Sequence, residues 1–407
     1  MRAYERLLNY VTIHTTSSEE TGTHPSFKGE FELGNKLKRE MEEIGLTDIV
    51  LDEKCYLYGF LPATKGYENA TPIGFIAHMD TAPDASGEGV EPILHKEYDG
   101  SVVKYPKSKA CMDPEKFPFL KSMVGETLIT SSGDTLLGAD DKAGLAEIMT
   151  AMSEIVEKNI PHGPLYVGFT PDEEIGEGAD YFDLKVFKAK YAYTVDGGDA
   201  NCLEYENFNA AGAKVVINGF SVHPGDAYKV MVNASNVAME FHALLPKEQR
   251  PEETRGREGF FHLTDMKGET QKAELSYIIR DHDKTLFEEK KKKIQEVADT
   301  INQKYGDGTV ELTVKDSYYN MLEKIKPHMH LVETARLAIQ SEGMQVEEIA
   351  IRGGTDGARL SFEGLPCPNL GTGGFNFHGP FECITAERMD RVVNVILNLV
   401  EKYRDFK

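Results

Sequence analysis

At 407 residues, the chain is longer than one hydrophobic core usually fills, so two domains are expected. Its formal net charge of −22, from 67 acidic and 45 basic residues, disfavours nucleic acid and anionic membrane surfaces as partners. Hydrophobic residues make up 40% of the chain, but no apolar run approaches the ~20 residues of a membrane-spanning helix. The composition predicts an acidic globular protein that binds neither nucleic acid nor membrane.

The N-terminus and the cysteines bear on the cellular compartment. The first residues include Arg2, Glu5 and Arg6 and lack an uninterrupted apolar stretch, which argues against a signal peptide. Leu7 and Val11 suit a short amphipathic helix instead. The five cysteines are odd in number and contain no Cys-x-x-Cys pair, a pattern typical of free thiols in a reducing compartment. We therefore expect a cytoplasmic protein.

Predicted helices and strands alternate on both sides of a different middle segment. Apolar residues at helical spacing predict helices around residues 33–44, 145–156 and 389–400. Runs of β-branched and aromatic residues predict buried strands at 72–77, 165–170 and 191–195. Gly45 is a favourable C-terminal cap for the first helix. This alternation favours an α/β fold, with a mixed sheet flanked by helices.

The middle segment, residues 209–320, has a different order of elements. It predicts a strand, helix, strand, helix and strand at 214–218, 237–244, 273–279, 286–301 and 309–314. This order is sufficient for a small α+β insertion. The charged run at 288–293 is most simply the solvated face of its second helix. The segment 82–120 is long enough to be functional rather than a plain connector.

Histidines and carboxylates follow the predicted strands in a spaced series. They are His78 and Asp80, Asp140, Glu173 and Glu174, Asp196, and His378. Taken singly each signal is weak, because His78 could be structural, Asp140 could cap its helix and a Glu-Glu pair is usually solvated. Ligands of open α/β sheets collect at the carboxyl ends of strands, so these side chains are expected in one crevice. Jointly, two histidines and three carboxylates match a two-zinc site of mixed nitrogen and oxygen ligands.

The order of these motifs resembles the aminoacylase, dipeptidase and desuccinylase family of co-catalytic zinc hydrolases. The motifs are His78-x-Asp80, Gly138-Ala139-Asp140-Asp141-Lys142, Asp172-Glu173-Glu174-Ile175-Gly176, Asp196-Gly197-Gly198 and His378-Gly379. Four further segments resemble the tripeptide aminopeptidases of that family, namely 221–225, 277–281, 316–320 and 351–357. The resemblance covers essentially the whole chain. It implies a zinc-exopeptidase-like fold with a smaller inserted lid domain of ferredoxin-like form.

The resemblance also implies a role for each motif residue. The first zinc would be bound by His78, Asp140 and Asp196, and the second by Glu174, His378 and the other oxygen of Asp140. Asp80 would hold the His78 ring, and Glu173 would be the general base. Cobalt or manganese could substitute for zinc. A cis peptide bond between Asp140 and Asp141 is implied as well.

Three further residues would act on the substrate. The resemblance makes His223 a donor to the oxyanion, and makes Arg280 and Arg352 ligands of a substrate carboxylate. All metal ligands lie outside 209–320, whereas His223 and Arg280 lie inside, so the insertion is expected to close over substrate. The alternatives are a simple turn at His223 and a surface ion pair between Arg280 and Asp281. Asp226 and Pro380 depart from the family pattern, which affects the expected substrate preference.

The resemblance therefore implies a tripeptide aminopeptidase acting on short peptides with a free N-terminus. Residues 1–208 and 321–407 would form its catalytic domain and 209–320 its lid, and a homodimer is compatible with this assignment. A dipeptidase or an N-acyl amino-acid deacylase of the same family is the first alternative. A metal-binding protein without catalysis is the second, although such a protein needs no free base like Glu173.

Overall fold

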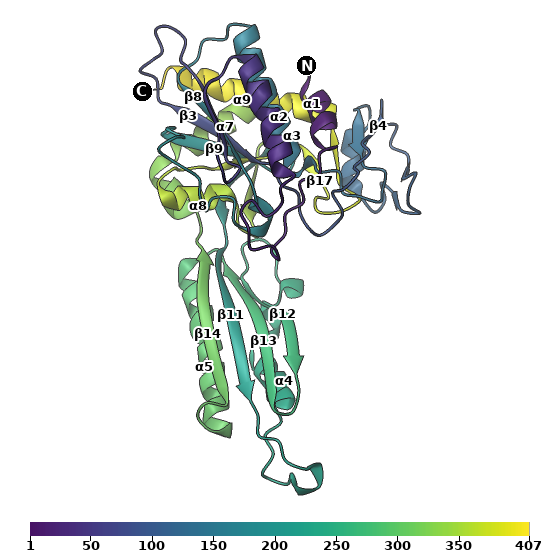
Figure 1. Ribbon diagram of the computed structural model, residues 1–407, viewed down its shortest axis with the longest axis vertical. Coiled ribbons are helices and arrows are strands. Elements are labelled where there is room, and N and C mark those ends of the chain that lie inside the picture. The colour runs from purple at the N-terminus through teal and green to yellow at the C-terminus, as the bar shows by residue number, and fades with distance from the viewer. Residues whose placement is uncertain (407) are drawn as a thin grey trace. The chain divides into compact units, whose positions relative to one another are not determined.

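The computed structural model describes residues 1–406 and divides into two compact units (Figure 1). Unit 1 contains Met1–Tyr205, Glu323–Ile349 and the chain from Thr355 onward, and unit 2 contains Glu206–Leu322 and Ala350–Gly354. The short segment 350–354 was not expected in unit 2 from the sequence. Its Arg352 donates hydrogen bonds to the carbonyls of Gly256, at 2.7 Å, and Glu258, at 3.0 Å, which fixes it there.

Unit 1 is built on an eight-stranded mixed sheet of order β1-β2-β8-β3-β9-β16-β10-β15. Its strands are β1 (Thr47–Leu51), β2 (Leu57–Leu61), β3 (Ile73–His78), β8 (Leu165–Thr170), β9 (Tyr191–Val195), β10 (Cys202–Asn207), β15 (Glu347–Ile351) and β16 (Asn369–Leu370). β3 runs parallel to both β8 and β9 at the centre. The three strands predicted from apolar runs are confirmed, and they are these central ones.

Helices cover both faces of this sheet. They are α1 (Ala3–Tyr10), α2 (Glu30–Ile44), α3 (Ala139–Glu157), α6 (Leu322–Ile325), α7 (His330–Ser341), α8 (Asp356–Glu363) and α9 (Ala386–Arg404). On one face the hydroxyl groups of Tyr193 in β9 and Tyr403 in α9 form a hydrogen bond of 3.0 Å. On the other, Ala192 packs in a core with Leu360 of α8. Adjacent strand residues thus face opposite helical layers, as the alternation of a strand requires.

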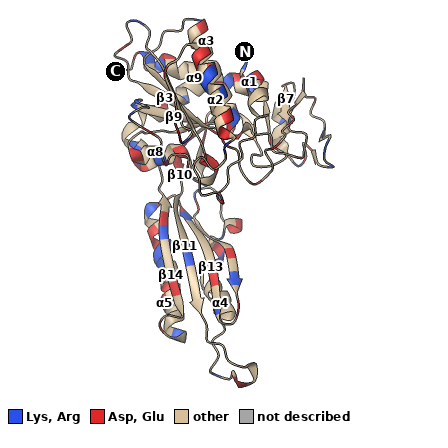
Figure 2. Cartoon of the chain, in the orientation of Figure 1, with Lys and Arg blue, Asp and Glu red and all other residues tan. Residues whose placement is uncertain are grey.

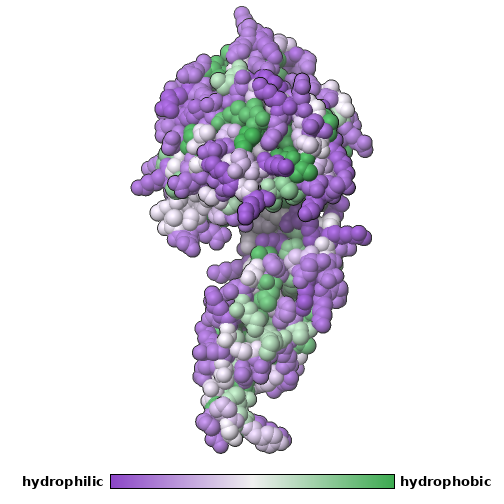
Figure 3. Space-filling view, turned by 90° about the vertical axis from the view of Figure 1, so that its right-hand side faces the viewer, coloured by the Kyte–Doolittle hydropathy of each residue, from purple (hydrophilic) through white to green (hydrophobic). Residues whose placement is uncertain are grey.

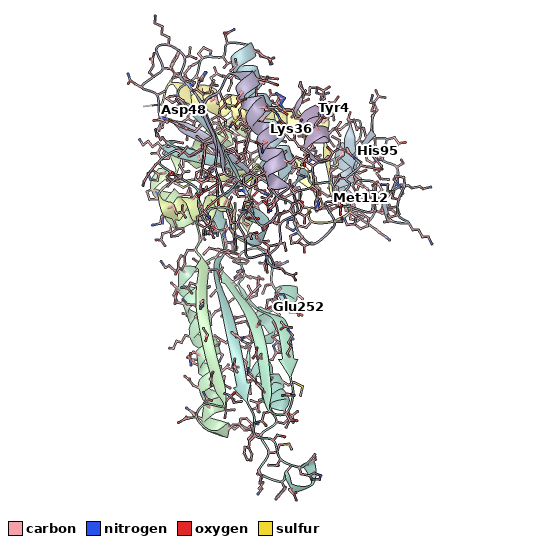
Figure 4. All side chains as sticks on the ribbon, in the orientation of Figure 1. Tyr4, Lys36, Asp48, His95, Met112 and Glu252 are labelled. Carbon is pink, nitrogen blue, oxygen red and sulfur yellow. The ribbon has the colours of Figure 1, made fainter. Side chains whose placement is uncertain are left out.

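The long segment after β3 forms a small lobe with its own core. It contributes β4 (Ile93–His95), the hairpin β5 (Val103–Lys104) and β6 (Cys111–Met112), and the 3₁₀ helix η1 (Pro118–Met123). β4 belongs to a four-stranded sheet with β7 (Leu128–Thr130), β17 (Gly374–Phe375) and β18 (Cys383–Thr385). Met112, labelled with His95 in Figure 4, is fully buried among Tyr98, Leu120 and Cys383. The segment that follows β3 is therefore packed against β18, the strand that comes after His378.

Unit 2 contains a four-stranded antiparallel sheet of order β12-β13-β11-β14 with two helices. The elements are β11 (Asn209–Asn218), α4 (Ala234–Leu244), β12 (Phe260–Gly268), β13 (Lys272–Asp281), α5 (Lys284–Tyr305) and β14 (Val310–Tyr318). This order is ferredoxin-like. The sequence prediction missed β12, because it is an edge strand whose side chains are mostly exposed and do not form a continuous apolar run.

Figure 2 shows that α5 is rich in charged residues, but burial of one of them corrects the prediction of a wholly solvated face. Lys290 is buried, and its ammonium lies 3.0 Å from the carboxylate of Asp281. The expected alternative, a surface pair between Arg280 and Asp281, is therefore wrong: Asp281 is buried and pairs with Lys290. A buried ion pair needs both partners, since one alone would leave an uncompensated charge.

Hydrophilic residues predominate on the face of the molecule shown in Figure 3, with apolar residues scattered among them. Among residues 1–406, no helix combines the length and the apolarity needed to cross a membrane. All five cysteines are free thiols, four of them buried and Cys111 exposed.

Glu147, in the middle of α3, generates a stability prediction. Its side chain is fully buried, and within the part of the chain that the structure describes neither carboxylate oxygen has a hydrogen-bond partner. Burial raises its pKa well above the usual value. Folding therefore favours the protonated acid. The favourable contribution is complete below the pKa of the unfolded chain, about 4.5, and is lost as the pH rises toward the folded-state pKa.

Replacing Glu147 with Gln should flatten this pH dependence. The free energy of unfolding of the parent should fall relative to the variant by up to about 1.4 kcal/mol per pH unit above pH ~5. Urea unfolding at several pH values between 5 and 9 measures this difference. Glu154→Gln, on the same helix but partly exposed and paired with Lys158, is the control. Parallel pH profiles for parent and Glu147→Gln would contradict the prediction.

Candidate two-metal site

The predicted ligands come from loops at one edge of the unit 1 sheet. His78 ends β3, and the 3₁₀ turn η2 (Glu173–Ile175) follows β8 after two residues. Asp196 follows β9 directly. Because β3, β8 and β9 are parallel and in register, their carboxyl ends meet. Asp140 lies at the start of α3, and His378 follows β17.

The carboxylate of Asp140 lies between the two histidines. Its Oδ1 is 3.0 Å from Nε2 of His78, and its Oδ2 is 3.4 Å from Nε2 of His378. His78 Nε2 is also 3.7 Å from Oδ1 of Asp196. His378 Nε2 is 3.0 Å from Oε2 of Glu174. The structure thus brings all five predicted ligands together, in two groups that share Asp140.

These donors fit a pair of divalent cations. Six carboxylates gather around two imidazoles, from Asp80, Asp140, Asp141, Glu173, Glu174 and Asp196. Glu174 Oε1 is buried and has no hydrogen-bond partner among the described residues 1–406. Such a surplus of buried negative charge is unfavourable unless cations offset it. Imidazole nitrogen and carboxylate oxygen are the ligand types that zinc takes.

The electrostatic field of the site appears in the histidine pKa values. Although burial disfavours a charged ring, the carboxylates of Asp140, Asp196 and Asp80 raise the pKa of His78 well above its usual value. Hydrogen bonding to Asp140 and Glu174 raises the pKa of His378 to about 11. Each ring nitrogen therefore occupies a position where positive charge is strongly favoured.

Asp80 connects the His78 strand to the turn that carries the two glutamates. Its main-chain oxygen lies 3.1 Å, and its Oδ1 3.2 Å, from Nδ1 of His78. The same carboxylate accepts the N–H groups of Glu173, at 2.9 Å, and Glu174, at 3.1 Å. Asp80 is fully buried, so these bonds are shielded from water. It therefore orients a ligand ring and the neighbouring turn together.

Glu173 and Glu174 are separated by the curvature of η2 rather than by strand alternation. Both residues lie in this 3₁₀ turn and not in an extended segment. Glu174 faces His378, whereas Glu173 pairs with no histidine among residues 1–406. Burial, with the charge of Asp196 nearby, raises the pKa of Glu173 well above its usual value. A carboxylate with a raised pKa is suited to accept a proton near neutral pH.

Residues that sequence reasoning missed brace this turn from the other side. Asp172 lies in the left-handed region, with φ 54°, and its N–H donates to Glu30 at 3.2 Å. Its carboxylate accepts the N–H of Ser26 at 2.8 Å and lies 3.2 Å from the His24 ring. Glu30 is fully buried. The only sequence signal was the position of Asp172 directly before Glu173.

The start of α3 is shaped by close approaches. The peptide bond between Asp140 and Asp141 is cis, as the resemblance implied. Asp141 is buried, and its carboxylate accepts the N–H of His78 at 3.1 Å. A Cβ at Gly144 would lie 2.0 Å from the Val195 carbonyl and 2.6 Å from Asp141 Oδ1. Only glycine fits there, and this allows α3 to start against the strand that precedes Asp196.

The three predicted substrate residues belong to unit 2, whereas the five ligands belong to unit 1. His223 is 80% exposed, and its Nδ1 accepts the N–H of Gly225 at 3.1 Å. Arg280 donates to the Ile279 carbonyl at 3.2 Å and lies over the Tyr318 ring. Arg352 donates to three acceptors within unit 2, including Thr254.

Comparison with known proteins places the chain in a family. A profile of peptidase family M20/M25/M40 matches residues 136–402. Proteins named peptidase T from Alkaliphilus oremlandii and Caldanaerobacter subterraneus are 51% and 48% identical to it. The matches cover 98% and 99% of this chain and 98% of each relative.

Solved structures share the fold. An aminopeptidase PepT from Bacillus cereus has a TM-score of 0.79 at 24% identity, covering 99% of this chain and 98% of that one. A Bacillus subtilis protein described as a dinuclear metal-binding peptidase of the M20 family has a TM-score of 0.65 at 16% identity, covering 98% and 97%. The sequence match and the full-length relatives agree, and the chain belongs to peptidase family M20/M25/M40.

Proposed function

We propose that this metallo-exopeptidase is a tripeptide aminopeptidase that holds two zinc ions in the Asp140-centred site. The observation that carries the proposal is the Asp140 carboxylate, which faces His78 with one oxygen and His378 with the other. The full-length likeness to proteins named peptidase T supports the peptide specificity. Zinc is proposed from the ligand types, with cobalt or manganese as substitutes. Five free cysteines support a cytoplasmic location.

The residues would divide the work as follows. Zinc ions held by His78, Asp140 and Asp196 and by Asp140, Glu174 and His378 would polarise the scissile carbonyl and acidify water. Glu173 would take the proton of the attacking water and pass it to the nitrogen of the leaving amine. Asp80 would hold the His78 ring and the Glu173 main chain in place during both transfers.

The substrate roles of unit 2 residues follow from their donors. Because Nδ1 of His223 accepts the Gly225 N–H, the neutral ring carries its proton on Nε2. That N–H is the group we propose as donor to the oxyanion. Arg280 and Arg352 are proposed to bind the substrate carboxylate. Arg352 also braces unit 2 through Thr254, Gly256 and Glu258, so its removal should affect stability as well.

Substrate profiling tests the proposed function. Purified zinc-loaded protein should release the N-terminal residue of Ala-Ala-Ala faster than it cleaves Ala-Ala, and should leave N-acetylated Ala-Ala-Ala intact. Chelation should abolish the activity, and added zinc should restore it. Preference for Ala-Ala would favour the dipeptidase alternative, and cleavage of the acetylated peptide would favour the deacylase. Inactivity of zinc-loaded protein on every short peptide would favour a metal-binding protein without catalysis.

Glutamine variants separate the two adjacent glutamates. Glu174 faces His378, so Glu174→Gln should weaken one metal site, and excess zinc should restore part of the activity. Glu173→Gln should retain both ions while kcat falls by ~10²–10⁴, the usual scale for loss of a general base. Zinc titration with a competing chelator measures both variants. Loss of an ion in Glu173→Gln, with none in Glu174→Gln, would reverse the assignment.

Replacing His223 with Ala should lower kcat by roughly 10²–10³ if its Nε2 stabilises the oxyanion. The zinc content should not change, because no metal ligand lies in unit 2. Steady-state kinetics on Ala-Ala-Ala provide the measurement, and His262→Ala, on the edge strand β12, is a matched control. A change in kcat of less than twofold would leave His223 with its turn contact to Gly225 alone.

A further inference from the structure

Glu382, four residues after His378, gathers three main-chain N–H groups of the loop that leads into Asp140. Its Oε2 accepts the N–H groups of Leu137 and Gly138, each at 2.8 Å. Its Oε1 accepts the N–H of Asp140 at 2.9 Å. The side chain is 1% exposed, so water does not compete for these donors.

The loop needs such an acceptor because of its shape. Gly138 is in the left-handed region, with φ 79°, and caps the start of α3 without a side-chain hydrogen bond. This turn directs the N–H groups of residues 137, 138 and 140 toward one point. Buried N–H groups without acceptors are strongly unfavourable. A carboxylate with two oxygens, placed at that point, satisfies all three.

The same residue is also tied to the loop that carries His378. The main-chain N–H of Glu382 donates to the Gly379 carbonyl at 3.1 Å, which closes the turn directly after His378. Glu382 immediately precedes β18, whose Cys383 is paired with both β17 and β7. One residue therefore holds the Asp140 loop with its side chain and the His378 turn with its main chain, and a strand anchors it.

We propose that Glu382 is a positioning residue that fixes the Asp140 carboxylate between the two metal positions. It does so through the main chain of the loop and without touching a metal ion or substrate. The inference rests on the proposed two-metal function. Because Asp140 faces both histidines, displacement of its main chain would disturb both metal positions together. Loss of a ligand such as Glu174, by contrast, would affect one position.

Glu382→Gln is the informative variant. Gln keeps the size of the side chain but replaces one carboxylate oxygen with an NH₂ group. At least one main-chain N–H of the loop must then face this NH₂ group, which is itself a donor and cannot accept the hydrogen bond. Hydrogen–deuterium exchange of the metal-free protein should be faster at residues 137–140. Competition with a chelator should show both ions bound about 10–100-fold more weakly, the usual effect of removing a residue that orients ligands.

Glu387→Gln is the matched control. Glu387 is a partly buried glutamate five residues further on, and its carboxylate likewise accepts a main-chain N–H, that of Thr127 at 2.7 Å. It has no contact with a metal ligand among residues 1–406, so zinc affinity and exchange at 137–140 should match the parent. If Glu382→Gln does not accumulate as folded protein, Glu382→Asp, which withdraws the carboxylate by one methylene, is measured in the same way.

Two ions bound with parental affinity, together with parental exchange at 137–140, would overturn the proposal. Weakening of a single ion would overturn it too, since the loop supports both positions. Neither readout uses a peptide. If the parent cleaves no peptide while Glu382→Gln loosens both ions, the aminopeptidase proposal fails and the positioning role stands.

Discussion

The carboxylate of Asp140 is held between two imidazoles, 3.0 Å from His78 on one side and 3.4 Å from His378 on the other. Two rings from different parts of the chain can meet one carboxylate only if its main chain is fixed closely. Gly144 allows α3 to start against the Val195 carbonyl, and Glu382 holds the loop before it. The parallel strands β3, β8 and β9 end at the same edge of the unit 1 sheet. His78, the Glu173–Glu174 turn and Asp196 therefore lie at the same edge.

Carboxylates in this site have two kinds of neighbour. Some face the imidazoles, where cations would offset their charge. Others accept main-chain N–H groups and act as supports. The consecutive N–H groups of Asp172, Glu173 and Glu174 all donate to carboxylates, the first to Glu30 and the next two to Asp80. A turn bound in this way at three successive residues is rigid, and rigid supports are what a catalytic constellation requires.

The sequence was sufficient for the centre of the fold and for the residues that would bind metal. β3, β8 and β9 are buried on both faces, so their apolar runs are continuous and easily recognised. The five proposed ligands could be named from the sequence because each lies in a motif beside a predicted strand or helix, and the structure brings their side chains together. The sequence also singled out Glu173 beside Glu174, but it did not predict the 3₁₀ turn that contains both residues.

What the sequence did not indicate depends on contacts between distant segments. β12 is a mostly exposed edge strand without a continuous apolar run, and it is recognisable only from its pairing with β13. Lys290 looks like a solvated lysine until Asp281 is placed beside it. Glu382 accepts the N–H of Asp140 although the two residues are 242 positions apart in the chain. Every residue except proline has a main-chain N–H, so the sequence does not indicate which of them Glu382 binds. Glu382 supports the site rather than forming it, which is why no motif reveals it.

Anomalous diffraction at the zinc edge, from crystals of the zinc-loaded protein, tests the central claim most directly. Two peaks about 3.5–4 Å apart should flank the Asp140 carboxylate, one beside His78 and Asp196 and the other beside His378 and Glu174. A single peak at full occupancy, or two peaks that do not share Asp140, would contradict the account.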